Sequence, residues 1–322
     1  MKTRKLGHTQ LHLTTIGLGT WAMGGGDWKF GWGPQEDNAS INAIHNALDL
    51  GINWIDTAAI YGHGHAEEVV GKAIKGIRDE VIIATKCGRV WEGESREIGK
   101  SLRAKSIRRE VEASLKRLSI EVIDLYQIHW PEPDQEIEEG WDTMAQLVRE
   151  GKVRYVGVSN FNLEQLKRAQ AIYPIASLQP PYSMFRREIE EEILAYCDNN
   201  QIGIIAYSPM QAGLLTGKFS RERALSLPDS DWRSRHPFFN EPQLSVNLET
   251  IERLNKIAIE ENISLSQLSL AWVLRNKEMT SAIVGARNPK QIKETAKASE
   301  ITLTKTNIKA IEKILDWRIK NL

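Results

Sequence analysis

The stretch Asn53-Trp54-Ile55-Asp56-Thr57-Ala58-Ala59-Ile60-Tyr61-Gly62 decides the fold of this chain. A short apolar run ends on a carboxylate, and a tyrosine follows five positions later among small residues. Such a run is typical of a buried strand. Asp56 would then end the strand with Tyr61 in the loop above it, on the face where α/β folds place their reactive groups. The stretch therefore predicts one corner of a site, whose other members would come from neighbouring strands.

Outward from this stretch, short β-branched runs alternate with amphipathic helical patterns along the whole chain. The expected strands are residues 16–19, 53–56, 81–86, 123–129, 155–159, 176–179, 202–207 and 280–284. Each strand-and-helix unit takes about the 30 residues of a βαβ crossover, and no break in composition divides the series. Eight parallel strands with helices between them can close into a barrel, which we favour over an open doubly wound sheet. We therefore predict an α/β fold, a (β/α)8 TIM barrel, as a single domain over residues 1–322.

Three additions to the barrel are expected. Residues 4–6 and 11–13 flank a polar turn and predict a hairpin that plugs the amino-terminal mouth of the barrel. Between the last two strands lie two helical patterns, 248–260 and 266–276, one more than a barrel needs. A final helix is predicted over residues 307–319, so the barrel should carry two extra helices.

Composition excludes several classes of partner. The chain has 322 residues, 41% of them hydrophobic, and 42 basic residues balance 42 acidic ones. A neutral chain lacks the basic field that nucleic acid or an anionic membrane requires. No apolar run approaches the ~20 residues of a membrane span, and the amino terminus leads into no secretory apolar segment. We expect a cytoplasmic protein that binds neither nucleic acid nor membrane.

No metal or redox motif is evident in the sequence. Cys87 and Cys197 are spaced neither as a metal knuckle nor as a CxxC pair. His63 and His65, beside Tyr61, have no third clustered ligand, so we expect a polar turn there rather than a metal site.

Polar side chains end three successive predicted strands. Asp56 ends the second strand, Lys86 the third and His129 the fourth, while Tyr61 lies in the loop after the second. Each residue taken alone is more often structural than functional. Because the carboxyl ends of parallel barrel strands open at one mouth, the four side chains should converge there. Their convergence predicts a reactive site.

The chemistry of these residue types suits proton donation. A tyrosine is a poor acid at neutral pH, but a buried ammonium beside it favours the phenolate, so Lys86 should lower the pKa of Tyr61. A buried lysine keeps its charge only when paired, which is the role expected of Asp56. His129 can hydrogen-bond a carbonyl oxygen and orient a substrate. The group suits protonation of a carbonyl oxygen while a hydride reaches its carbon.

Five motifs are distinctive, namely Ile16-Gly17-Leu18-Gly19-Thr20-Trp21, Asp56-Thr57-Ala58 with Tyr61-Gly62, Ala84-Thr85-Lys86, Asp124-Leu125-Tyr126-Gln127-Ile128-His129-Trp130 and Gly157-Val158-Ser159-Asn160-Phe161. With them the chain resembles the aldo-keto reductase family, and within it bacterial NADPH-dependent members, over nearly its whole length. The resemblance implies a TIM barrel that binds NADP(H) without a Rossmann domain. It also implies a catalytic tetrad of Asp56, Tyr61, Lys86 and His129, with Tyr61 as the general acid.

The resemblance also implies the cofactor contacts. They are Gly19, Thr20, Trp21 and Asp56; Ser159, Asn160 and Gln179 on the nicotinamide carboxamide; Tyr207 stacked on the ring; Ser208, Pro209, Gln211, Gly213, Leu214, Gly217 and Lys218 in a pyrophosphate loop; and Gly285, Ala286, Arg287, Gln291, Glu294 and Thr295 in the adenosine-phosphate segment. Glycines in a loop allow backbone N–H groups to approach phosphate, and a lysine adds a point charge.

Arg287 bears on the choice of cofactor. A guanidinium at a helix start can grip a ribose 2′-phosphate, which favours NADP(H) over NAD(H). The surrounding segment departs from the family pattern: many members carry a lysine-serine pair at Gly285-Ala286, an arginine at Gln291 and an asparagine at Thr295. NADP(H) is therefore the expected cofactor, with NAD(H) as the alternative.

Tryptophans mark the expected substrate pocket. Trp21, Trp28, Trp32, Trp91, Trp130 and Trp232 fall in or beside loops on the same mouth of the barrel. They suggest an apolar pocket for a small carbonyl substrate, an aldehyde or ketone. About half of these tryptophans should instead only pack loops against the barrel.

Two other functions remain open from the sequence. The first is a cofactor-sensing regulatory subunit resembling the potassium-channel β subunits, which share this barrel and cofactor. The second is a (β/α)8 isomerase or lyase that uses no nicotinamide. Multiple turnover with small aldehydes would distinguish an enzyme from the sensor, and quenching of tryptophan fluorescence by NADPH would argue against the isomerase.

Overall fold

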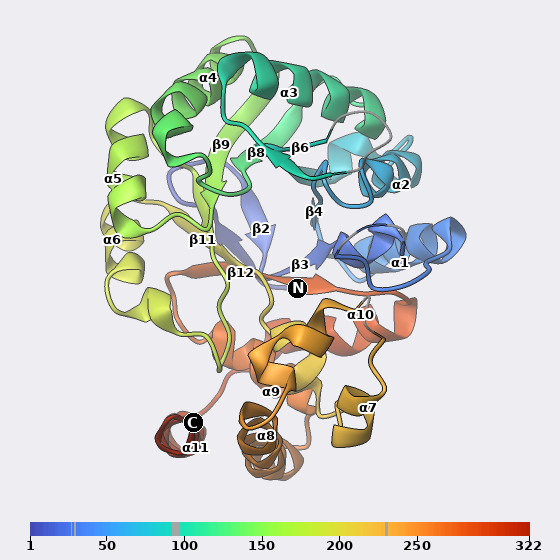
Figure 1. The fold of residues 1–322 in the computed structure, drawn as a ribbon, viewed down its shortest axis with the longest axis vertical. Helices are drawn as coiled ribbons and strands as arrows, with labels where there is room; N and C mark the ends of the chain where they lie inside the picture. The colour runs from blue at the N-terminus through green and yellow to red at the C-terminus, as the bar shows by residue number, and fades with distance from the viewer. Residues whose placement is uncertain (27, 29, 92–96, 229–230) are drawn as a thin grey trace.

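Eight parallel strands form a closed barrel in a computed structural model that describes residues 1–26, 28, 30–91, 97–228 and 231–322 (Figure 1). The strands are β3 (Ile16–Gly19), β4 (Trp54–Asp56), β5 (Ile82–Cys87), β8 (Ile123–Ile128), β9 (Val153–Ser159), β10 (Ser177–Gln179), β11 (Gly203–Ala206) and β12 (Met279–Gly285). They pair in chain order, and β12 returns to pair with β3. The predicted (β/α)8 barrel is confirmed, and each predicted strand is present within three residues at either end.

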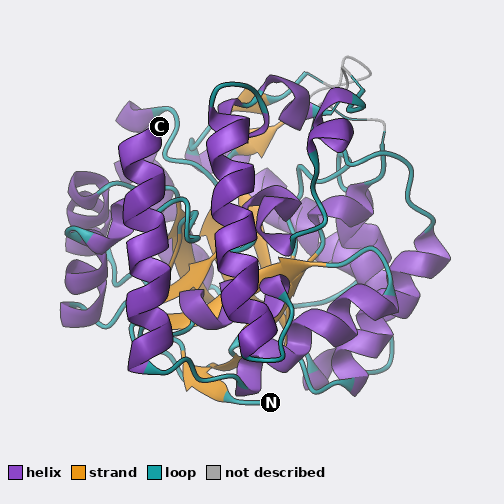
Figure 2. Ribbon diagram, turned by 90° about the horizontal axis from the view of Figure 1, so that it is seen from below, coloured by secondary structure: helices purple, strands orange, loops and turns teal. Residues whose placement is uncertain are grey.

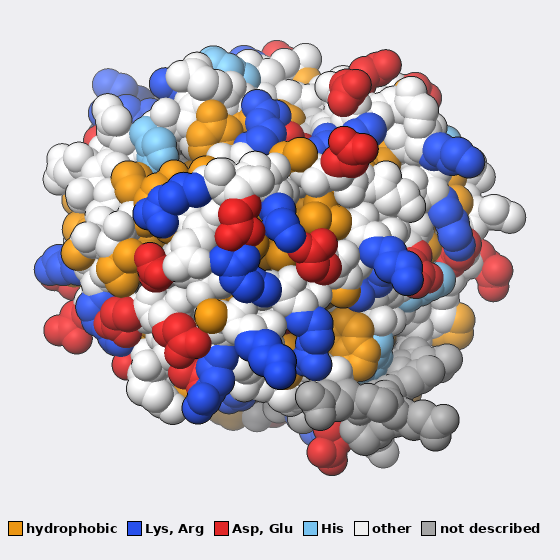
Figure 3. Space-filling view, turned by 90° about the horizontal axis from the view of Figure 1, so that it is seen from above, with side chains coloured by type: hydrophobic (Ala, Val, Ile, Leu, Met, Phe, Trp, Pro, Cys, Tyr) orange, Lys and Arg blue, Asp and Glu red, His pale blue; other side chains and the backbone are white. Residues whose placement is uncertain are grey.

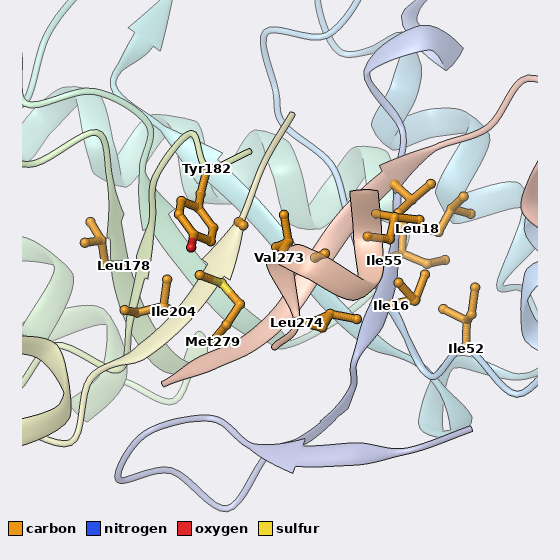
Figure 4. Close-up of a cluster of buried hydrophobic side chains, with 14 of the residues drawn as sticks. Ile16, Leu18, Ile52, Ile55, Leu178, Tyr182, Ile204, Val273, Leu274 and Met279 are labelled. Atoms are coloured by element: carbon orange, nitrogen blue, oxygen red, sulfur yellow. The ribbon is translucent and has the colours of Figure 1, made fainter. Parts of the chain in front are cut away.

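The barrel strands are short and almost entirely buried. Residues that are apolar on both faces suit them, since one face points into the barrel and the other packs under helices. Figure 4 shows part of this outer layer, where Ile16 and Ile55 of the strands lie in one cluster with Val273 and Leu274 of the helical layer. Packing inside the barrel and against the helices therefore fixes the strand ends, and with them the side chains at those ends.

Helices surround the barrel. Those that follow barrel strands are α1 (Asp37–Asp49), α2 (His65–Ala73), α3 (Ala104–Leu118), α4 (Ile137–Arg149), α5 (Leu163–Ile172), α6 (Ile193–Asn199), α9 (Leu265–Val273) and α10 (Pro289–Ala296). Capping boxes start α5 and α9: Asn162 and Ser264 each accept the backbone N–H three residues on, and a glutamine side chain returns the bond. Because β12 pairs with β3, α10 lies beside α1 (Figure 1).

The amino-terminal hairpin plugs the barrel, as the sequence predicted. Strands β1 (Thr3–Lys5) and β2 (His12–Thr14) pair antiparallel. Leu6, Leu11 and Leu13 are buried in an inner cluster that includes residues of the barrel strands such as Trp54. A Cβ on Gly203 would lie 2.4 Å from Leu6, so the close approach of the plug requires glycine there.

The predicted extra helices are α8 (Gln243–Glu260) and α11 (Lys305–Asn321), which pack alongside each other outside the barrel (Figures 1 and 2). A short α7 (Arg221–Leu225) and a two-stranded sheet of β6 (Arg89–Val90) and β7 (Gly99–Lys100) were not predicted. A strand of two residues is too short to show an alternation of apolar and polar residues, so β6 and β7 could not be predicted from the sequence.

The surface carries both signs of charge. Lysine and arginine side chains intermingle with aspartate and glutamate on the face drawn in Figure 3. Within the described part of the chain, no helix has the length and apolar character needed to cross a membrane.

Candidate active site

A cavity of about 600 Å³ opens at the carboxyl ends of the barrel strands. Its wall includes Asp56 of β4, Ser159 of β9, Gln179 of β10 and Gly285 of β12. The same cavity reaches Arg287, beyond the end of β12. One continuous space therefore joins the strand ends to the segment before α10.

Lys86 lies at the centre of the predicted tetrad. Its ammonium Nζ donates to Asp56 Oδ2 at 2.7 Å and to the carbonyl oxygen of Thr57 at 2.9 Å. The Tyr61 hydroxyl oxygen lies 3.4 Å from the same Nζ. Lys86 and Asp56 are 1% and 2% exposed, so the pair is shielded from water. This is the geometry expected from the sequence: the tyrosine within reach of the lysine, and the aspartate behind it.

His129 completes the group from the residue after β8. Its ring packs edge-on to the Tyr61 ring with centroids 5.9 Å apart, and both residues line the cavity. Asn160 Nδ2 donates to the His129 backbone carbonyl at 3.0 Å, which ties the end of β8 to the end of β9. Asp56, Tyr61 and His129 thus line one space, and Lys86 lies behind them, in contact with Asp56 and Tyr61.

Burial controls the proton affinities of these groups. Burial, and then the charge of Asp56, raise the pKa of Tyr61 well above its usual value. The lowering of this pKa that the sequence predicted from Lys86 is not found, because burial of the phenol and the charge of Asp56 outweigh the effect of the ammonium. Burial, followed by the charges of Lys86 and Arg89, lowers the pKa of His129 well below its usual value. At neutral pH the site holds a protonated phenol and a neutral imidazole.

Glu67 of α2 is a buried carboxylate that the sequence reading missed. Its Oε1 accepts from the Thr85 hydroxyl and its Oε2 from Arg117 Nε, both at 2.6 Å. Burial lowers the pKa of Lys86, whereas the charges of Asp56 and then Glu67 raise it. Glu67 thus helps to keep the ammonium charged. A glutamate on an amphipathic helix looks like a surface residue in the sequence, so only the packing reveals it.

The residues implied for the nicotinamide form one hydrogen-bonded group. Tyr207 donates to Asn160 Oδ1 at 2.8 Å, and Asn160 Nδ2 lies 3.0 Å from Ser159 Oγ. Ser159 Oγ donates to the Gln179 carbonyl at 2.7 Å, and Gln179 Nε2 donates to Asp56 Oδ1 at 2.8 Å. All of these residues line the cavity. The group therefore joins the proposed nicotinamide end to the carboxylate that holds Lys86.

Gly19 and Trp21 also line the cavity, whereas Thr20 is buried behind it and donates to the Asp56 carbonyl oxygen at 3.2 Å.

The loop after β11, which the sequence predicts to bind pyrophosphate, is rich in left-handed backbone. Five of its residues have positive φ, namely Ser208 (52°), Gln211 (47°), Ala212 (51°), Gly213 (92°) and Gly217 (73°). Two of their backbone N–H groups donate within the loop, that of Gln211 to the Ser208 carbonyl at 2.9 Å and that of Gly213 to the Met210 carbonyl at 3.1 Å. Ser208, Pro209, Gly213 and Lys218 line the cavity, while Gln211, Leu214 and Gly217 do not contribute to its described wall.

The far end of the cavity is formed by α10 and the residues before it. Gly285, Arg287, Gln291, Glu294 and Thr295 line it, whereas Ala286 is buried outside its described wall. Gln291 Oε1 accepts the backbone N–H of Arg287 at 2.8 Å. Lys218 Nζ lies 3.1 Å from Glu294 Oε2, so the loop after β11 and α10 meet across the cavity.

The tryptophans divide into two groups. Trp21, Trp28, Trp32 and Trp130 line the cavity. Trp91 and Trp232 stand outside its described wall: Trp91 packs against His63 and Arg117, and Trp232 packs behind Trp21 and Trp32. Lining residues that the sequence did not predict include Phe30, Ile98, Met210 and Phe219. They lie in loops, where no periodicity marks the inward face.

Among the described residues, no cluster of histidine, cysteine, aspartate or glutamate could hold a metal ion.

Comparisons with known proteins agree on one family. The model of the "Aldo/keto reductase family" matches residues 15–316. The aldo-keto reductase YhdN of Bacillus subtilis is 40% identical over 324 residues, which cover 100% of this chain and 96% of that protein. The NADH-specific methylglyoxal reductase of Escherichia coli is 35% identical, covering 94% of this chain and 95% of that one. The glycerol dehydrogenase AKR11B4 of Gluconobacter oxydans superimposes with a TM-score of 0.91 at 37% identity, covering 99% and 97% of the two chains.

Proposed function

The chain belongs to the aldo/keto reductase family of oxidoreductases, and we propose that it is an NADP(H)-dependent enzyme that reduces aldehydes or ketones to alcohols. The observation that carries the proposal is the single cavity that joins Tyr61 and His129 at one end to Arg287 at the other. A carbonyl group and an anchored dinucleotide can meet in that space. A bound nicotinamide supplies the hydride, from its C4 carbon.

Tyr61 is the proton donor in this proposal. Its phenol is protonated at neutral pH, since the usual pKa of a tyrosine is about 10 and burial raises that of Tyr61 further, so a proton is available to a carbonyl oxygen in the cavity. Lys86 Nζ, at 3.4 Å, faces the phenolate that proton transfer would leave and stabilises it. Asp56, at 2.7 Å, keeps the lysine charged in a buried position.

His129 orients the substrate. Its imidazole is neutral, because burial and the charges of Lys86 and Arg89 lower its pKa. A neutral imidazole offers one N–H donor to a carbonyl oxygen and does not compete with Tyr61 as an acid. The edge-on packing of the His129 and Tyr61 rings, with centroids 5.9 Å apart, supports this role.

The remaining residues of the cavity fit an extended dinucleotide. Ser159, Asn160 and Gln179 would hold the carboxamide and Tyr207 the nicotinamide ring. The left-handed residues of the loop from 208 to 217 fit a pyrophosphate. Four tryptophans would form the apolar wall against the substrate. We take residues 1–322 as one catalytic domain.

The preference for NADP(H) rests on Arg287. A guanidinium that faces the cavity next to α10 suits the second charge of a 2′-phosphate. The Escherichia coli relative is named as NADH-specific, so the preference has to be measured for this chain. We expect kcat/KM with NADPH to exceed that with NADH by about 10- to 100-fold, the effect of one charge-assisted contact.

A steady-state screen of aldehydes, ketones and sugars, followed at 340 nm with NADPH and with NADH, tests the proposal. Sustained turnover that is lost in Tyr61→Phe supports it. Tight binding of the cofactor with no turnover of any carbonyl would favour the cofactor-sensing alternative instead.

A further inference from the structure

The segment of residues 32–35, here called the strap, follows β3 and contacts Arg287, which follows the neighbouring strand β12. Arg287 Nε donates to Gln35 Oε1 at 2.9 Å, Nη1 to the Trp32 carbonyl at 3.3 Å and Nη2 to the Pro34 carbonyl at 2.5 Å. Gln35 Nε2 in turn donates to the Arg287 carbonyl and to Ser40 Oγ, both at 3.2 Å. The strap thus grips the side chain and the backbone of Arg287 and is anchored to α1.

These contacts leave Arg287 able to bind an anion. A guanidinium has five N–H donors, and the strap engages three of them, so two remain. The three engaged donors fix the plane of the group. A guanidinium that is already oriented loses less freedom when it binds a phosphate, which strengthens the contact.

The other side of the strap enters the substrate pocket. The Trp32 indole packs edge-on to Trp21 at 5.8 Å and to Trp232 at 6.3 Å, under the guanidinium of Arg233 at 4.5 Å. Trp21 stacks on Tyr61 at 6.3 Å. Trp32 is therefore shared: its carbonyl contacts Arg287, and its ring contacts an aromatic wall that continues to Tyr61.

We propose that the strap couples the phosphate end of the cavity to the substrate pocket, with Gln35 as the positioning residue for Arg287 and Trp32 as the link to the pocket. A 2′-phosphate on Arg287 holds the strap, and the strap holds Trp32 against Trp21. Substrate then binds more tightly beside NADPH than beside NADH. By linkage, a substrate packed against Trp32 strengthens phosphate binding by the same factor. The inference rests on the proposed NADP(H)-dependent reduction.

Two variants test separately the contact of the strap with Arg287 and its contact with the substrate pocket. Gln35→Ala removes the amide that orients Arg287, and Trp32→Ala removes the indole but keeps the backbone carbonyl. Trp32→Phe keeps an aromatic ring in case the alanine variant folds poorly. Asn38→Ala, an exposed neighbour on α1, is the matched control.

Phosphate recognition is read from the binding of adenosine 2′,5′-bisphosphate and adenosine 5′-monophosphate by calorimetry, without turnover. Gln35→Ala should lower the preference for the bisphosphate by about 3- to 10-fold, as loss of one or two hydrogen bonds predicts. Trp32→Ala and Asn38→Ala should change it by less than about 2-fold.

Coupling is read from the ratio of the substrate KM with NADH to that with NADPH. The ratio should exceed 1 in the parent and in the control Asn38→Ala. It should approach 1 in Gln35→Ala and in Trp32→Ala. Trp32→Phe should keep at least part of the parental ratio. A parental ratio in Gln35→Ala overturns the inference and leaves the proposed function intact. A parent with a ratio of 1 also overturns it, and a parent with no carbonyl turnover overturns the proposed function itself.

Discussion

The two ends of the cavity are built in different ways. At the catalytic end, Asp56 and Lys86 belong to strands β4 and β5, are almost fully buried and lie 2.7 Å apart. At the phosphate end, Arg287 is only partly buried and is held by the side chain and carbonyls of a loop. The comparison teaches that the barrel itself fixes the proposed chemistry, whereas loops fix the proposed cofactor choice.

Loss of the Tyr61 hydroxyl should have the largest effect. Tyr61→Phe removes the proton donor and leaves the ring in place, so we expect kcat to fall by about 10³-fold or more. Binding of NADPH, followed by quenching of tryptophan fluorescence, should stay within about 2-fold of the parent. Turnover near the parental level would remove Tyr61 from the mechanism.

The buried pair gives the next largest effect. Lys86→Met leaves the Asp56 carboxylate buried without its cation, which should cost about 3–5 kcal/mol of stability in urea unfolding. The double variant Lys86→Met with Asp56→Asn should recover a large part of that loss, because no buried charge remains unpaired. If the single variant were as stable as the parent, water would have to reach Asp56, contrary to its 2% exposure.

Substitution of Arg287, at the proposed phosphate end, should have a smaller effect, and that effect should appear in the kinetics with NADPH. Arg287→Ala should raise KM for NADPH by about 10- to 100-fold while changing KM for NADH by less than about 2-fold. Raising ionic strength should weaken NADPH binding to the parent but affect the buried pair little, since salt screens exposed charges most. Equal effects on both cofactors would place Arg287 away from the 2′-phosphate.

The smallest effect is expected from pH. His129 stays neutral below its usual pKa and Tyr61 stays protonated above its usual pKa, so the hydride-transfer rate in single turnovers should be flat from about pH 6.5 to 9. An acidic limb in the hydride-transfer rate near pH 6.5 that vanishes in His129→Gln would contradict this prediction.

The same two pKa shifts determine how the free energy of unfolding depends on pH. Because the pKa of His129 is lowered by folding, stability is lost as the pH falls below about 6.5. Because the pKa of Tyr61 is raised by folding, stability is lost as the pH rises above about 10.

The sequence predicted that the polar side chains at the strand ends come together. Asp56, Lys86 and His129 each follow an apolar run that ends a strand, and the strands of a parallel barrel bring such positions to one mouth. Periodicity and spacing were therefore enough to expect that they meet. The hairpin plug was predictable for the same reason, since its apolar and turn residues alternate locally.

Other features depend on contacts that have no local signal. Glu67 looks like a surface residue of α2, yet it is buried against Thr85 and Arg117. The raised pKa of Tyr61 follows from burial and from Asp56, whereas residue types alone had suggested a lowered value. Burial is a property of the whole packing, so the sequence could not supply it.

By itself, then, the sequence determined the barrel, the strand ends and the meeting of four polar side chains there, because each depends on local periodicity and on the closure of eight parallel strands. Only the tertiary structure decided how Gln35 meets Arg287, since these residues are 252 positions apart and are joined by loops. It also decided which tryptophans line the cavity. Loop contacts arise from packing between distant segments, which no local pattern encodes.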